Sequence, residues 1–211
     1  MTEGLARILA VASGQLLRQT MVPIYVPGAP SLARELNDLL AARNGFYAFE
    51  SALHMFPSGP SSAGTMTLER WNSDELWRNS YGDLANGFFF LAEDVFGGQF
   101  AVKGDRIWTF DPETAQTKPM ASSLEAWARA LLDDYEVLTG YPIAREWQAL
   151  HGPLKEATRL MPKTPFVLGG GYTIANLAAV DAVQAMRLRG DMATQIRDLP
   201  EGAAIRLKIV D

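Results

Sequence analysis

The chain has no cysteine, only two histidines and no apolar run approaching the length of a membrane span. Without cysteine there is no disulfide framework, no thiolate metal site and no thiol nucleophile. A transmembrane helix needs about 20 consecutive apolar residues, so we predict a protein without a membrane span. The apolar stretch of residues 5–12 contains Arg7 and follows Glu3, which argues against a signal peptide. The simplest expectation is a cytoplasmic protein.

Motifs of metal, nucleotide or nucleophilic chemistry are also missing. His54 lies among apolar residues, and His151 precedes Gly152, so neither belongs to a recognisable zinc pattern. No Gly-x-Ser-x-Gly sequence marks a nucleophilic serine. The triple glycine at 169–171 lacks both the Lys-Ser/Thr of a Walker loop and the third glycine of a dinucleotide fingerprint. We therefore predict no metal and no cofactor, while a hydrolase that uses His54 or a carboxylate pair stays open as an alternative.

Negative charge is concentrated in the middle of the chain. Residues 69–136 carry 13 acidic and 6 basic side chains, a balance of −7, within a total net charge of −5. Residues 1–68 balance to 0 and residues 137–211 to +2. Phosphate binding needs clustered Lys and Arg, so this distribution disfavours nucleic acid as a partner. A basic protein partner is favoured.

Apolar periodicity and chain breakers predict the order of the elements. Helices are expected over residues 2–19, 31–43, 73–78, 122–139, 142–150 and 174–189, and strands over 88–92, 100–102, 107–108, 162–168 and 205–210. An extended connector should follow the first helix, because residues 21–30 contain three prolines. Ser31 is expected to cap the second helix, and Ser122 with Glu125 to form a capping box on the fourth.

The best-marked unit is a strand meander between Gly87 and Glu113. Three phenylalanines begin a strand, Gly97-Gly98 allows a sharp reversal, and Lys103-Gly104-Asp105 suits a hairpin turn. The meander contains no nucleophile, histidine or cysteine. It is therefore interpreted as a binding platform.

Aromatic and acidic residues in and beside the meander are the candidate partner contacts. Trp71 and Trp77 flank an acidic turn, and tryptophan is enriched at binding hot spots. Glu93 and Asp94 are adjacent in a strand, so they point to opposite faces and cannot easily form one catalytic dyad. One of the two is expected to support the glycine turn, and the other to be exposed for an incoming Arg or Lys. The candidate partner-binding residues are Trp71, Asp74, Glu75, Trp77, Glu93, Asp94 and Asp105.

Several segments, taken in order, resemble the SUKH superfamily of fungal cell-wall regulators and bacterial immunity proteins. The resemblance covers residues 30–138 and is carried by Arg43–Phe46, Gly87–Glu93, Val95–Val102, Asp105–Asp111 and Ser122–Trp127. It implies an α+β fold, with a curved, mostly antiparallel sheet and helices packed against it. It also implies a non-enzymatic protein that binds another protein, in bacteria often a toxin.

We therefore expect one domain over residues 1–211. Residues 1–29 should form an N-terminal helix and connector, 30–138 the SUKH-like core, and 139–211 an α/β extension packed on that core. The expected function is that of an intracellular immunity protein that neutralises a basic toxin domain. A housekeeping adaptor of the same fold is the alternative within this class.

Overall fold

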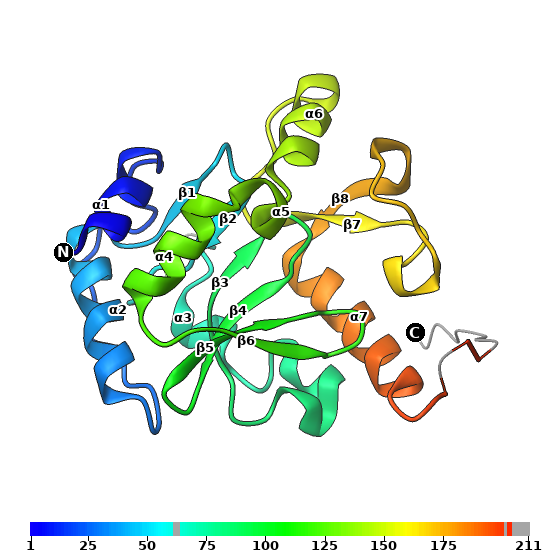
Figure 1. Cartoon of the computed structure of the whole chain (residues 1–211), viewed down its shortest axis with the longest axis horizontal. Coiled ribbons are helices and arrows are strands. Elements are labelled where there is room, and N and C mark those ends of the chain that lie inside the picture. Colours follow the sequence, from blue (N-terminus) through cyan, green and yellow to red (C-terminus); the bar gives the residue numbers. More distant parts are fainter. Residues whose placement is uncertain (61–63, 201, 204–211) are drawn as a thin grey trace.

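A computed structural model describes residues 1–60, 64–200 and 202–203, and it shows an α+β fold (Figure 1). Six antiparallel strands form the main sheet in sequential order, β1 (Phe46–Ala48), β2 (Leu53–Met55), β3 (Phe89–Asp94), β4 (Gln99–Lys103), β5 (Arg106–Phe110) and β6 (Thr117–Ala121). A second, two-stranded antiparallel sheet pairs β7 (Thr158–Pro162) with β8 (Leu177–Asp181). The predicted fold class is confirmed.

Seven α-helices and three short 3-10 helices are present in the described residues. The α-helices are α1 (Glu3–Ala10), α2 (Pro30–Ala42), α3 (Leu68–Trp71), α4 (Leu124–Asp133), α5 (Tyr135–Thr139), α6 (Tyr141–His151) and α7 (Ala182–Ile196). The 3-10 helices are η1 (Arg78–Ala85), η2 (Phe166–Leu168) and η3 (Ile174–Asn176). Within this described part, no helix combines the length and apolar character needed to cross a membrane.

Helices cover both faces of the main sheet. Helix α4 lies across one face, beside α1 and α2, and its Trp127 ring meets Phe100 of β4 edge-on at 5.7 Å (Figure 1). On the opposite face, Phe90 and Phe110 join an aromatic cluster with α3 and η1. Helix α7 packs on η1, and its Met186 belongs to the same core. Residues beyond 139 therefore share the core of the sheet that precedes them.

The meander follows the predicted strands closely, and β3, β4 and β5 pair in antiparallel register. Strand β6, which was not predicted, extends the sheet at its edge. The helix predicted over residues 122–139 is divided into α4 and α5, and its N-cap lies one residue later than expected. Ser123, not Ser122, is its N-cap and accepts a bond from Ala126 N at 3.1 Å. The predicted capping box is wrong, because Glu125 turns away to the N-terminus of α1, where Gly4 N donates to both its oxygens.

Two further helix predictions differ from the structure near the N-terminus. The first helix ends at Ala10 instead of residue 19. Just after this end, the Arg43 guanidinium donates to the carbonyl oxygens of Leu9 and Ser13, at 2.7 and 3.0 Å. Helix α2 begins at Pro30 without a side-chain cap, so Ser31 does not cap it. Its leucine stripe is buried as predicted. The helix predicted over residues 73–78 is replaced by α3 before it and η1 after it.

The C-terminal extension is the least accurately predicted part. The predicted strand 162–168 is shifted, because β7 ends at Pro162 and residues 166–168 form η2. The predicted helix 174–189 begins only at Ala182, where Asp181 caps it by accepting from Gln184 N at 2.9 Å. Residues 177–181 pair with β7 instead. The strand predicted over residues 205–210 lies outside the described residues.

Candidate functional site

The two tryptophans predicted to contact a partner lie in the core. Trp71 and Trp77 are 0 % and 1 % exposed, and their ring centroids are 5.4 Å apart. Trp71 also stacks on Phe56, and its indole Nε1 donates to Gln99 Oε1 at 2.9 Å. Their assignment as surface contacts is wrong, because packing against the sheet leaves no ring face free for another protein.

Glu93 is also buried, at the centre of a polar network. Its Oε1 accepts from Arg159 Nε at 2.8 Å and lies 3.0 Å from His54 Nδ1, and Gln99 Nε2 donates to Oε2 at 3.3 Å. Burial alone would raise the pKa of Glu93, but the Arg159 charge and the bonds from His54 and Gln99 together lower it. Glu93 is therefore an internal anion that holds β7 to the main sheet, and its assignment as an exposed partner contact is wrong.

His54, the histidine of the hydrolase alternative, lies in this network with little free space beside it. Burial lowers the pKa of His54 to about 4, so the ring is neutral at pH 7. Tyr47 stacks on one side of the ring, with centroids 4.4 Å apart, and the adjoining cavity measures about 30 Å³. That volume suits about one water molecule. Among the described residues, no three histidine or carboxylate side chains converge as a metal site.

Three of the predicted acidic contacts are exposed but lie in different turns. Asp74 and Glu75 precede η1, where Asp74 pairs with Arg78 at 3.1 Å, and Asp105 lies in the β4–β5 turn. None of the three lines the main cleft. Their role in partner binding stays a prediction.

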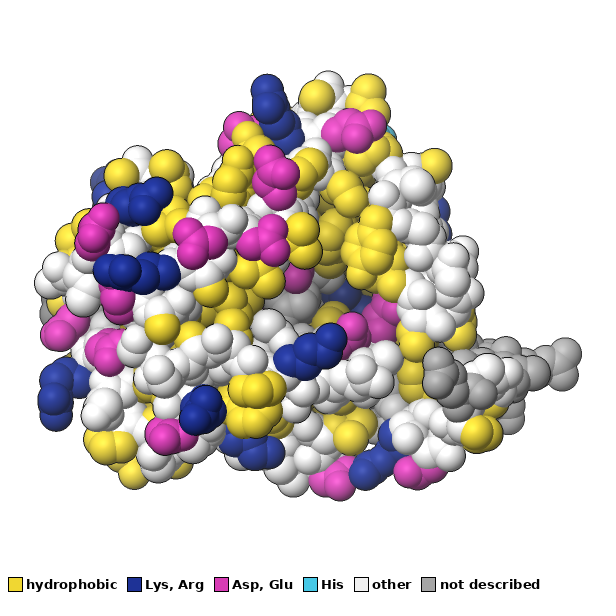
Figure 2. Space-filling view, viewed as in Figure 1, with side chains coloured by type: hydrophobic (Ala, Val, Ile, Leu, Met, Phe, Trp, Pro, Cys, Tyr) yellow, Lys and Arg dark blue, Asp and Glu magenta, His cyan; other side chains and the backbone are white. Residues whose placement is uncertain are grey.

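Asp94 differs from these acids because it lies in a cleft of about 410 Å³ at the end of β3 and β4. Figure 2 shows this hollow near the middle of one face, with hydrophobic and acidic side chains along its upper edge. The cleft is bounded by the 94–98 turn, by β5 and β6, by the 111–113 turn, by α5 and by the 166–172 segment, with Arg189 of α7 at its wall. Two of these parts, the 166–172 segment and Arg189, belong to the C-terminal extension.

Asp94 holds the glycine turn with one carboxylate oxygen. Its Oδ1 accepts from Phe96 N and Gly98 N, both at 2.8 Å, so one acid of the 93–94 pair does support the turn. A side chain at residue 98 would collide with Oδ2, which explains the glycine there. Burial raises the pKa of Asp94 to about 7, against the lowering effect of these two bonds. Both hydrogen bonds that the described residues donate to the Asp94 side chain go to Oδ1, and none goes to Oδ2.

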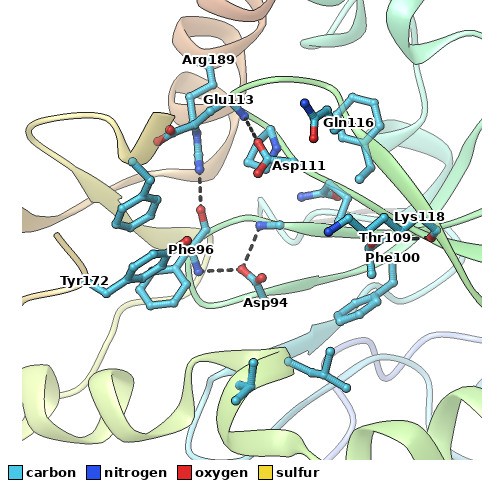
Figure 3. Close-up of a pocket in the computed structure, with 17 residues that line it drawn as sticks. Asp94, Phe96, Phe100, Thr109, Asp111, Glu113, Gln116, Lys118, Tyr172 and Arg189 are labelled. Carbon is cyan, nitrogen blue, oxygen red and sulfur yellow. Dashed lines mark hydrogen bonds between the residues drawn. The ribbon is translucent and has the colours of Figure 1, made fainter. Parts of the chain in front are cut away.

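Glu113 and Arg189 are buried at the cleft wall, and each has a polar atom without a partner (Figure 3). Glu113 is 3 % exposed, and its Oε2 accepts from Val167 N at 2.8 Å, but Oε1 is unpaired in the described structure. Arg189 is 2 % exposed and donates to the carbonyls of Phe96 and Ala185, which leaves Nη2 unpaired there. Burial also raises the pKa of Glu113. Unpaired buried polar atoms are uncommon and each needs an explanation. The described structure has others away from the cleft, on Trp77, Trp127, Trp147 and Arg159, so the two cleft atoms count only together with the cleft itself.

Aromatic and apolar side chains complete the cleft. The rings of Phe166 and Tyr172 stack at 3.8 Å, and Phe96 meets the Tyr172 ring edge-on at 5.3 Å. Tyr172 is 58 % exposed and Val137 on α5 is 75 % exposed. An accessible apolar surface therefore adjoins the cleft carboxylates.

The sequence contained a signal for Arg189 that periodicity alone could have revealed. Helix α7 buries a stripe of side chains at helical spacing, namely Ala182, Ala185, Met186, Arg189, Met192 and Ala193. An arginine within such a stripe indicates a buried cation. Arg159, by contrast, lies in a short strand without a comparable pattern, and only the fold shows its partner 66 residues away.

The chain matches no protein-family model and no curated protein. Its fold is similar to that of a solved structure, Atu4351 from Agrobacterium tumefaciens, with a TM-score of 0.56 and 15 % sequence identity. The similarity covers 87 % of this chain and 86 % of the other. At this identity it shows a shared fold that includes most of the C-terminal extension.

Proposed function

We propose that this protein is a non-enzymatic binding module of the cytoplasm, an immunity-type protein that holds a basic toxin domain against the cleft face. The observation that carries the proposal is the combination of unpaired acidic groups with exposed apolar side chains around one cleft. The SUKH-like order of motifs, which implies toxin neutralisation, adds to it.

Acidic side chains gather around the cleft from separate elements. Asp94, Asp111 and Glu113 line it, and Asp133, Asp134 and Glu136 are exposed on the adjoining α4–α5 segment. Lys118 and Arg189 are the basic residues of the lining. We name the three exposed α4–α5 acids the acidic rim. Such a surplus of negative charge accelerates the approach of a basic partner and makes binding sensitive to salt.

Exposed apolar groups beside the rim supply contact area. Val137 follows the rim directly, and Tyr172 with Val167 and Leu168 lies on the extension side of the cleft. Aromatic and aliphatic side chains ringed by polar groups are typical of binding hot spots. A protein partner would cover both sides of the cleft at once.

The test compares two triple variants with the same change in charge. In the rim variant, Asp133, Asp134 and Glu136 become Lys; in the control, Asp38, Glu146 and Asp191, which are exposed and do not line the cleft, become Lys. Proteins captured from a native-host lysate by the wild type are identified, expressed and measured for affinity at several salt concentrations. The rim variant should bind a captured partner about tenfold more weakly or worse, with a smaller salt slope, while the control keeps near wild-type affinity.

Growth assays separate immunity from adaptor function. An immunity partner should arrest growth when expressed alone and become harmless when this chain is co-expressed. A captured partner that is harmless by itself would favour the adaptor alternative. Equal binding by the rim variant and the wild type would refute the cleft face as the interface. Ester, phosphate or glycoside hydrolysis that disappears in His54→Ala or Glu93→Gln would refute a non-enzymatic function.

A further inference from the structure

We infer that the cleft receives the guanidinium group of an arginine from the protein partner, with Asp94 and Glu113 as acceptors and Tyr172 beside it. This inference rests on the proposed function, because it names the partner side chain that would enter the cleft. It follows from the acceptors that the fold leaves unpaired, from the state of Arg189 and from the aromatic wall.

The cleft contains two carboxylates whose hydrogen bonding is half complete. Glu113 uses Oε2 for Val167 N, and its Oε1 has no partner in the described structure. Asp94 uses Oδ1 for the glycine turn, and no described residue donates to Oδ2. Each carboxylate is held in place by backbone N–H groups. Glu113 Oε1 is itself enclosed, so a donor reaches it only after a small movement of the cleft wall, whereas Asp94 Oδ2 is not among the enclosed atoms. A planar guanidinium carries five N–H donors and can bond two carboxylates from different edges.

Arg189 does not make the cleft an anion site. Its Nη1 and Nε already donate to Phe96 O and Ala185 O, so the guanidinium is fixed beneath the 94–98 turn. Its Nη2 is packed against Gly97, where an added Cβ would lie 2.7 Å from it. Figure 3 shows Arg189 and Glu113 on one side of the cleft and Lys118 on another, with Asp94 below them in this view. The accessible, unpaired oxygen of Asp94 therefore favours a cation.

The aromatic wall favours a flat cation over a compact one. Tyr172 stacks on Phe166 through one ring face and is more than half exposed. A guanidinium can lie on such a ring while its edge bonds a carboxylate, whereas an ammonium offers a point charge. Arginine is therefore the better fit among the two basic side chains.

The protonation of Asp94 gives this binding a pH dependence. The pKa of Asp94 is about 7 because burial raises it; Glu93 from the same strand also raises it, and Arg189 from α7 lowers it. Burial raises the pKa of the facing Glu113 as well. A cation binds the ionised carboxylates, so arginine should bind more tightly as the pH rises through 7.

Nα-acetyl-arginine amide titrated into the ¹⁵N-labelled full chain tests the inference. The reporters are the amides of Phe96, Gly98 and Val167, which donate to Asp94 and Glu113. We expect saturable shifts with a millimolar Kd, several-fold tighter at pH 8 than at pH 6. Nα-acetyl-citrulline amide, the neutral isostere, should leave these amides unchanged. Asp94→Asn should weaken binding and reduce its pH dependence, Glu113→Gln should weaken binding, and Glu146→Gln, on an exposed residue outside the cleft, should leave it unchanged.

Four results would overturn the inference. The first two are equal shifts with the arginine and citrulline amides, and binding that is unchanged in both Asp94→Asn and Glu113→Gln. The third is the same set of shifts with sodium acetate, which would mark an anion site. The fourth is much tighter binding of free L-arginine, which would mark a metabolite site. The proposed function fails separately, through the rim variant. If a partner loses affinity for the rim variant but binds Asp94→Asn and Glu113→Gln as tightly as the wild type, only the inference of an arginine in the cleft is refuted.

Discussion

At the scale of single residues, Asp94 combines a structural task with a thermodynamic cost. Its folded-state pKa is about 7, raised by burial from an ordinary value of 3.8. Between these values the folded protein binds a proton that the unfolded chain lacks, so stability from this group falls as the pH rises from about 4 to above 7. A charged group maintained at such a cost is typical of a binding site.

Asp94→Asn should therefore stabilise the protein at pH 8 and change it little at pH 4. Asparagine can still accept the bonds from Phe96 N and Gly98 N but carries no charge to desolvate. We expect a gain on the order of 2 kcal/mol at pH 8, less than the full shift implies because solvent reaches the cleft. Urea denaturation at both pH values measures it, with Asp105→Asn as the exposed control. An equal effect at pH 4 and pH 8 would contradict the raised pKa.

At the scale of elements, local patterns that match a buried face were sufficient for prediction. The leucine stripe of α2 and the phenylalanine and glycine pattern of β3–β4 gave the right elements, because periodicity and turn chemistry act within a few residues. The prediction failed for strand β8, which was expected to be part of a helix, because Leu177–Asp181 consists mostly of small residues whose pattern is equally compatible with a helix. Its pairing with β7 decides the conformation, and that partner is distant in sequence.

Glu125 shows why capping patterns can mislead, and it gives a prediction for α1. Its bonds to Thr2 and its pair with Arg129 lower its pKa to about 2. Glu125→Ala should speed amide hydrogen exchange in α1 and leave α4 protected, because Ser123 still caps α4. The contribution of Glu125 is present above about pH 4.5 and is lost as the pH falls toward 2. Exchange mass spectrometry measures this, with Glu136→Ala as control; unchanged exchange in α1 would refute the clamp.

At the scale of the whole molecule, the cleft is built by contacts between residues far apart in sequence, so no local sequence pattern could predict it. The 94–98 turn was recognisable from its glycines, but Arg189 and Tyr172 reach the cleft from the C-terminal extension. Composition gave the acidic middle region correctly, but it could not separate a buried carboxylate from an exposed one. Glu93 and Asp94, adjacent in sequence, lie respectively in the internal network and at the cleft. The tertiary arrangement alone decides this division.

The Glu93–Arg159 pair joins the two sheets, so we expect the chain to unfold as one unit. Arg159→Met leaves a buried carboxylate without its cation, which typically costs about 3–5 kcal/mol. Urea denaturation followed by tryptophan fluorescence and far-UV circular dichroism should show one coincident transition for the wild type and a lower midpoint for the variant. Trp147 reports on the second cluster and Trp127 on the main core.

Matched variants separate the ion pair from general effects of losing an arginine. Arg145→Met removes an exposed arginine of α6 and should change stability by less than about 0.5 kcal/mol. Adding Glu93→Gln to Arg159→Met should recover part of the loss, because the uncompensated buried charge is then gone. If Arg159→Met were as stable as Arg145→Met, or if the two probes gave separate wild-type transitions, the extension would not be tied to the sheet through this pair. The cleft, which needs both parts in fixed register, would then lose its rigid wall.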